Sequence, residues 1–158
     1  MAVDVGTVRI GVARSAAGTT IAVPVETVPA GPGAVRSVAN LVVESAADVV
    51  YVGDPLRLDG TVGPAAEAAR SFAGDLAAVL QDTNGRAGHA GSSVTVEVRM
   101  IDERLTTAQS GKQMRAAGRD TRNARNVLDQ AAAVAILQNA LERECATGQP
   151  AGASVEQD

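Results

Sequence analysis

The first 28 residues contain three short segments rich in valine and isoleucine, and turn-forming residues separate them. The segments read MAVDV, VRIGVAR and TIAVPVETV, and glycines stand in both connections. Short β-branched runs between glycine-containing turns are typical of consecutive strands in one sheet. The sequence therefore predicts that the fold begins with an antiparallel meander of three strands.

The rest of the chain alternates helical and strand patterns. Helical spacing over 34–46 precedes the apolar strand DVVYVG, and a second helix over 64–80 precedes the strand VTVEVRMI. Further helices are expected over 105–118 and 126–144, and the last is apolar on nearly all sides, which predicts burial. This order predicts an α/β fold with a mixed sheet, antiparallel in its first three strands and parallel afterwards, and with helices on both faces.

Length and composition limit the domain organisation. The 158 residues suffice for one domain, expected over 1–144, and the remaining residues 145–158 are expected to form a flexible tail. No apolar run approaches the roughly 20 residues of a membrane span, and no signal-peptide pattern opens the chain. The single cysteine fits a reducing compartment. We therefore expect a cytoplasmic protein without membrane contact.

Three acidic residues lie where this topology brings them together. Asp4 is in the first strand, Asp129 is in the last helix, and either Asp102 or Glu103 ends the last strand. Three carboxylates within about 4 Å repel by several kcal/mol per pair at an effective dielectric near 20, so such a cluster needs a cation. Carboxylate oxygens without thiolate or imidazole favour Mg²⁺ or Mn²⁺, which support hydrolysis of phosphodiesters. Taken singly, each acid also has a structural interpretation as a helix-terminal or turn-stabilising residue.

Positive charge is concentrated in one stretch of this acidic chain. A net charge of −4 argues against general binding of nucleic acid. The stretch KQMRAAGRDTRNAR is nevertheless a candidate for phosphate contacts, although a solvated surface would show the same pattern. Near Asp4, Thr7 and Arg9 supply a hydroxyl group and a cation, which we expect to contact a phosphate of the nucleic acid. The basic residues of the stretch are Lys112, Arg115, Arg119, Arg122 and Arg125.

Four motifs, in their order and spacing, resemble the bacterial YqgF/RuvX-type proteins of the RNase H-like superfamily. They are DVGTVRIGVA, VYVGDPLRLDGTVGP, DERLTT and VLDQAAAVAILQNAL. Members of this family are described as Holliday-junction resolvases and as nucleases that mature the 5′ end of pre-16S ribosomal RNA. The resemblance extends to about Glu144 and implies an RNase H-like fold, in agreement with the topology above.

The resemblance also implies roles for individual residues. Asp4, Glu103 and Asp129 would be the catalytic metal ligands. The loop DPLRLDGTVGP would face the substrate, with contacts from Arg57, Asp59, Gly60 and Thr61. Further nucleic-acid contacts are implied for Arg104, Thr106, Thr107 and the basic residues from Lys112 onward.

Two features depart from the family pattern. Only three residues precede Asp4, whereas family members usually carry several more, so we expect either a mis-assigned start site or a shortened first strand. Asp54 follows Gly53 where the family typically has GLP. This extra acid would either join the metal site or cap the loop.

We therefore expect a metal-dependent endonuclease that hydrolyses phosphodiester bonds in structured nucleic acid, either pre-16S rRNA or a branched DNA junction. A catalytically silent RNA-binding assembly factor on the same fold is one alternative. An actin-like ATPase or sugar kinase is another, but such proteins repeat the strand-loop unit in a second domain, and this chain has no second copy. A homodimer is expected for a junction resolvase, which needs two symmetric active sites.

Overall fold

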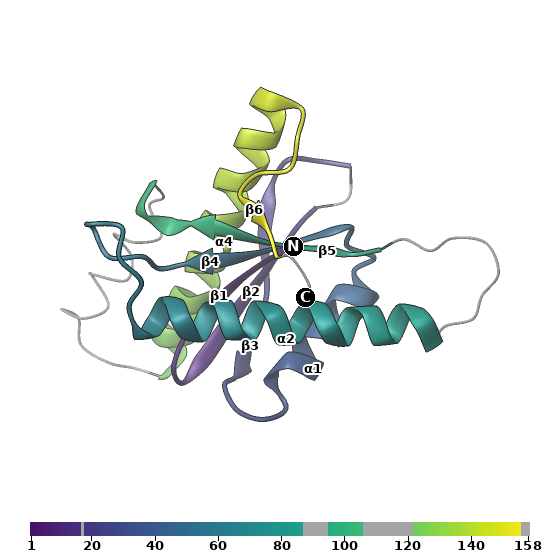
Figure 1. Cartoon of the computed structure of the whole chain (residues 1–158), viewed down its shortest axis with the longest axis horizontal. Coiled ribbons are helices and arrows are strands. Elements are labelled where there is room, and N and C mark those ends of the chain that lie inside the picture. Colours follow the sequence, from purple (N-terminus) through teal and green to yellow (C-terminus); the bar gives the residue numbers. More distant parts are fainter. Residues whose placement is uncertain (17, 87–94, 106–121, 156–158) are drawn as a thin grey trace.

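The computed structural model describes residues 1–16, 18–86, 95–105 and 122–155. Within these residues one mixed sheet has the strand order β3-β2-β1-β4-β5-β6 (Figure 1). The strands are β1 Ala2–Val5, β2 Arg9–Ser15, β3 Ala22–Pro29, β4 Val49–Asp54, β5 Glu97–Asp102 and β6 Ala153–Ser154.

The strand directions confirm the predicted sheet. Strands β1, β2 and β3 form the antiparallel meander, and the backbone N–H of Gly6 donates to the carbonyl of Arg9 at 3.0 Å where the chain turns from β1 to β2. Strand β4 then joins β1 in parallel, and β5 joins β4 in parallel. The fold is therefore α/β and consistent with an RNase H-like arrangement.

Helices cover both faces of this sheet, as predicted (Figure 1). Helices α1 and α2 pack on one face, against Val3 and Val52, whereas α4 packs on the other face, against Ala2 and Tyr51. Consecutive residues of a strand point to opposite faces, so each strand contributes to two separate cores. The helices are α1 Ala34–Glu44, α2 Pro64–Arg86 and α4 Arg122–Thr147, with the short 3₁₀ turn η1 Glu103–Leu105. The helix expected over 105–118 falls, beyond Leu105, outside the described residues.

Helix α4 is buried along one side only. Ala133, Ile136, Leu137 and Ala140 face the sheet and are buried, whereas Ala131 is exposed. The sequence predicted burial nearly all round, because small apolar residues occupy most of the helix surface. Alanine is the strongest helix former and is favoured on any face of a helix, so its presence alone does not identify a buried face.

The C-terminal residues differ from the expected tail. Helix α4 continues to Thr147, and β6 pairs with β5 in antiparallel orientation. The guanidinium group of Arg99 donates to the carbonyl oxygens of Ala151 at 2.6 Å and Gly152 at 2.7 Å. The buried hydroxyl group of Tyr51 donates to Glu144 and accepts the N–H of Ala151. Residues near the end are thus held by side chains from the centre of the sheet.

No helix among the described residues is both long enough and apolar enough to cross a bilayer.

A close approach at Gly11 brings α4 onto β2. A Cβ atom at Gly11 would overlap the backbone carbonyl oxygen of Asp129 and lie 2.6 Å from its carbonyl carbon. A side chain of any size would push the helix backbone away, because a backbone atom cannot move aside as a flexible side chain can. Glycine at this position therefore sets the distance between α4 and the sheet.

We expect Gly11→Ala to lower the free energy of unfolding by about 2 kcal/mol or more, the usual cost of overpacking. Gly74→Ala is the matched control, because Gly74 is an exposed position of α2 with open space around it. That change should raise the free energy of unfolding by about 0.5–1 kcal/mol through helix propensity. Urea unfolding of both variants measures the difference, and equal effects would contradict the close approach.

Candidate active site

Asp4 lies at the centre of the candidate site, near the carboxyl end of β1. Its side chain is buried, with 3% of the residue exposed. Its partner on β2 is Gly11, and the parallel register with β4, which pairs Val3 with Val52, continues to Gly53. Asp4 therefore stands between two glycines, and neither neighbouring strand places a side chain beside its carboxylate.

Glu103 lies over the second of these glycines. It follows β5 in the turn η1 and is 2% exposed. A Cβ atom at Gly53 would overlap the Glu103 carboxylate and lie 2.8 Å from Cδ1 of Ile136 on α4. The Glu103 carboxylate is therefore on the α4 face of the sheet, the face to which Ala2 and Asp4 also belong.

Asp129 approaches the first glycine from α4. It lies about two turns into the helix, on the side that carries Ala133 and Ile136. This position is too far from the helix start for a dipole interpretation, because that effect is confined to the first turn. The Nε atom of Arg9 donates to Oδ2 of Asp129 at 3.0 Å. The three predicted acids thus converge on one face, around Gly11 and Gly53.

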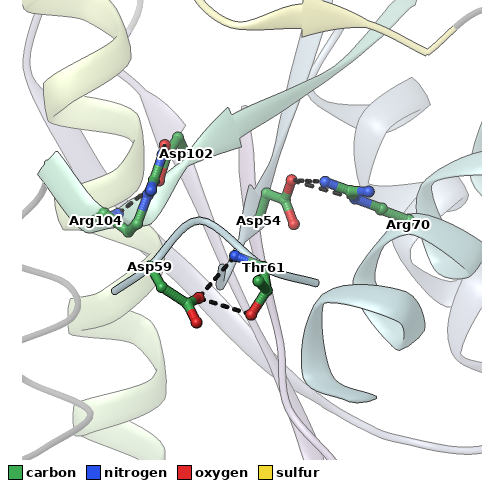
Figure 2. Close-up of polar contacts among 6 residues, drawn as sticks. All are labelled: Asp54, Asp59, Thr61, Arg70, Asp102 and Arg104. Atoms are coloured by element: carbon green, nitrogen blue, oxygen red, sulfur yellow. Dashed lines mark hydrogen bonds and ion pairs between the residues drawn. The ribbon is translucent and has the colours of Figure 1, made fainter. Parts of the chain in front are cut away.

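Asp102 has a different environment from Glu103. The Nε atom of Arg104 donates to Oδ1 and Oδ2 of Asp102 at 3.1 Å and 3.0 Å, and Nη2 donates to Oδ2 at 2.6 Å. The Arg104 backbone N–H also donates to Oδ1, at 2.9 Å (Figure 2). These hydrogen bonds from Arg104 hold the pKa of Asp102 below its usual range. Asp102 therefore anchors an arginine, whereas Glu103 faces the acids on the α4 side.

The loop after β4 lies beside Arg104. Asp59 accepts the backbone N–H of Thr61 at 2.9 Å and its hydroxyl group at 2.7 Å, and these bonds lower the pKa of Asp59 (Figure 2). Gly60 has a φ of +84°, and a Cβ there would lie 3.0 Å from Nη1 of Arg104. Arg57 is exposed on the same loop. The loop thus has a defined conformation that brings its tip next to Arg104.

Asp54 lies on the opposite face of the sheet from Asp4. It alternates with Gly53 along β4, and its carboxylate accepts two bonds from Arg70 of α2, at 3.2 Å and 2.8 Å (Figure 2). Asp54 is 6% exposed, and hydrogen bonding to it raises the pKa of Arg70. These contacts match neither of the two interpretations of this acid: Asp54 lies away from Asp4, and its carboxylate joins the end of β4 to α2 rather than capping the loop.

The remaining predicted contacts are only partly described. Thr7 is exposed at the turn between β1 and β2. The structure gives the helical backbone of Arg122 and Arg125 at the start of α4, without their side chains. The predicted contacts outside the described residues are Thr106, Thr107, Lys112, Arg115 and Arg119.

The chemistry of the three acids fits a hard divalent cation, because all their side-chain donors are carboxylate oxygens. Within the described residues, however, no group of three His, Cys, Asp or Glu side chains is arranged to hold a metal ion as it stands. In this arrangement Asp129 is engaged by Arg9. Ligation of one metal ion by all three acids would therefore require their side chains to move from these positions.

The mixed sheet, with three acids on its α4 face, is consistent with the class of RNase H-like α/β proteins. Comparison with known families gives a match over residues 1–143 to the family described as "RuvX: Holliday junction resolvase". The chain belongs to the RuvX family.

Relatives of nearly the same length support this assignment, and each is named "putative pre-16S rRNA nuclease". The relative from Thermobifida fusca is 45% identical, and the match covers 99% of this chain and 94% of the relative. The relative from Streptomyces coelicolor is 43% identical over 99% of this chain and 87% of the relative. The relative from Clavibacter sepedonicus is 42% identical over 98% and 89%.

The ion pair between Asp102 and Arg104 leads to a prediction about the pKa of Asp102. In Arg104→Gln the pKa of Asp102 should rise towards its usual value, because the largest cause of its depression is the bond to Arg104. A depressed carboxylate pKa stabilises the fold above the unfolded-state pKa, and this stabilisation is lost as the pH falls. The variant should therefore lose less stability on acidification than the parent.

Carboxyl-carbon NMR titration of Asp102 measures the shift, and Arg104→Lys is the control, since it keeps the charge but not the planar geometry of the guanidinium. The assignment is wrong if the Asp102 pKa is the same in the parent and in Arg104→Gln.

Proposed function

We propose that the protein is a metal-dependent endonuclease that processes the 5′ end of pre-16S rRNA. The observation that carries this proposal is the convergence of Asp4, Glu103 and Asp129 on one face of the sheet, around the close approaches at Gly11 and Gly53. The names of the relatives support an rRNA substrate, and the name of the family supports a branched DNA as the other candidate.

In this proposal the three carboxylates hold Mg²⁺ or Mn²⁺. A divalent ion in such a site can activate a water molecule and stabilise the negative charge that develops on a phosphodiester. Burial of Asp4 and Glu103 fixes their positions, because packed side chains have few alternative rotamers. Asp129 is presented by a helix seated directly on β2. The fold would thus hold the elements that carry the three ligands in place, and the side chains would move from their present positions to share a metal ion.

The surroundings of the site would position the nucleic-acid backbone. Arg57 is exposed on the loop after β4, and Arg104 lies beside the tip of that loop. Cations and hydroxyl groups of this kind contact phosphate without reading sequence, so selectivity would come from the shape of the substrate. The reaction would take place in the cytoplasm, and a homodimer would be needed only for symmetric cleavage of a DNA junction.

Substitution of single acids tests the catalytic assignment. Asp4→Asn and Asp129→Asn should each lower the cleavage rate by more than about 100-fold, because a neutral amide is a poor ligand for a hard cation. Asp75→Asn removes the same charge from an exposed position of α2 and should leave the rate unchanged. Single-turnover cleavage in Mg²⁺ gives the rates, and thermal unfolding shows that each variant is folded. Rapid cleavage by folded Asp4→Asn would exclude the proposed ligand.

The substrate is tested by giving the same purified protein a 5′-extended pre-16S rRNA fragment and a four-way DNA junction, in Mg²⁺ and in Mn²⁺. The proposal expects cleavage of the RNA, with Asp129→Asn as the inactive control. Symmetric cleavage of the junction alone would identify a resolvase instead. Salt-sensitive RNA binding without cleavage in either metal would identify a catalytically silent assembly factor.

A further inference from the structure

The contact between Arg9 and Asp129 joins a predicted phosphate ligand to a predicted metal ligand. Arg9 opens β2 directly after the turn at Thr7, and Asp129 belongs to α4, 120 residues away in sequence. The two side chains are largely buried, with 21% and 14% of their surfaces exposed. Partial burial strengthens an ion pair relative to an exposed one, because water screens it less.

Arg9 lies on the same face as the candidate site. Along β2, Ile10 and Val12 belong to the core under α1 and α2, so Arg9 and Gly11 point to the α4 face. Gly11 is the register partner of Asp4. The guanidinium group of Arg9 therefore stands beside the acids and next to the exposed turn of residues 6–8.

This cation and a metal ion compete for the same carboxylate. Asp129 can offer both oxygens to a cation, but a guanidinium group on Oδ2 would then stand close to a divalent ion and be repelled by it. Release of Arg9 would remove this repulsion and would free a planar group with five donors, which suits phosphate recognition. Arg9 needs no long movement, because the surface turn is two residues away.

We propose that Arg9 is an exchangeable counter-ion: it neutralises Asp129 until a divalent metal binds there, and it then binds a phosphate of the substrate. This inference rests on the proposed function, because it takes Asp129 as a metal ligand. It makes Arg9 a positioning residue that couples metal binding to substrate binding. Each ligand then favours the other through a shared side chain, as linkage requires.

Metal affinity tests the first half of the exchange. Calorimetric titration of the full chain with Mn²⁺ should show binding about fivefold or more tighter in Arg9→Gln than in the parent, the lower end of typical coupling between sites. Arg14→Gln is the matched control, because Arg14 is an exposed cation on the same strand. Its affinity should stay within about twofold of the parent, the context-dependence expected of screened surface charges.

The salt dependence of RNA binding tests the second half. In Ca²⁺ the slope of log affinity against log salt should be smaller in Arg9→Gln than in the parent by about 1, the effect of losing one phosphate contact. In EDTA the two slopes should agree, because Arg9 then remains on Asp129. In the Asp129→Asn variant, Arg9 should contribute to the salt slope of RNA binding in EDTA as well as in Ca²⁺. If Arg9→Gln only disturbed packing, the salt slope would change by the same amount in Ca²⁺ and in EDTA.

The possible failures are distinguishable. If Mn²⁺ binds neither the parent nor the variants, the proposed function and the exchange both fail. If the parent binds Mn²⁺ and cleaves RNA but Arg9→Gln matches Arg14→Gln in affinity and slope, the exchange alone is wrong. A slope difference of the same size in EDTA and Ca²⁺ would also overturn it, since it would make Arg9 a permanent phosphate contact.

Discussion

The arrangement of the candidate site depends on two strand positions that lack side chains. At Gly11 the backbone of α4 rests on β2, and at Gly53 the carboxylate of Glu103 occupies the space where a Cβ would be. Asp4 lies between these positions. Helix α4 and the turn η1 can therefore bring their carboxylates close to β1. Larger residues at Gly11 and Gly53 would prevent this approach. The pairing of Asp129 with Arg9 offsets part of the negative charge on this face.

Much of this arrangement could be predicted from the sequence. The strand segments were marked by β-branched runs, and the order of strands and helices determined a mixed sheet covered on both faces. The three acids were identifiable because each stands in or next to an apolar element, where a lone carboxylate is costly. The close approaches at Gly11 and Gly53 were not apparent from the sequence, because their partners come from α4 and from the turn after β5.

Other features could not be predicted because they join residues far apart in the sequence. The partner of Asp54 is Arg70, which lies on a helix that the sequence marks as only weakly amphipathic. The ion pair between Arg9 and Asp129 joins residues 120 positions apart. The C-terminal residues are held by Arg99, which donates to the carbonyl of Ala151, and by Tyr51, which accepts the N–H of Ala151. These contacts can be recognised only once β4 and β5 are known to be adjacent. The partner of a polar side chain depends on the three-dimensional arrangement of the chain, whereas the periodicity of apolar residues can be read directly from the sequence.

Two adjacent residues of β4 make contacts on opposite faces of the sheet, which limits how the length of this strand can change. Gly53 leaves room for Glu103 on one face, while Asp54 binds Arg70 on the other. A single-residue deletion inside β4 would place Asp54 against Glu103, and a single-residue insertion would place Gly53 opposite Arg70, so either change would disturb both contacts. Changes of length should therefore be tolerated in the exposed part of the following loop and excluded from the strand. Evolution of new substrate preferences would then proceed through the loop while the strand register stays constant.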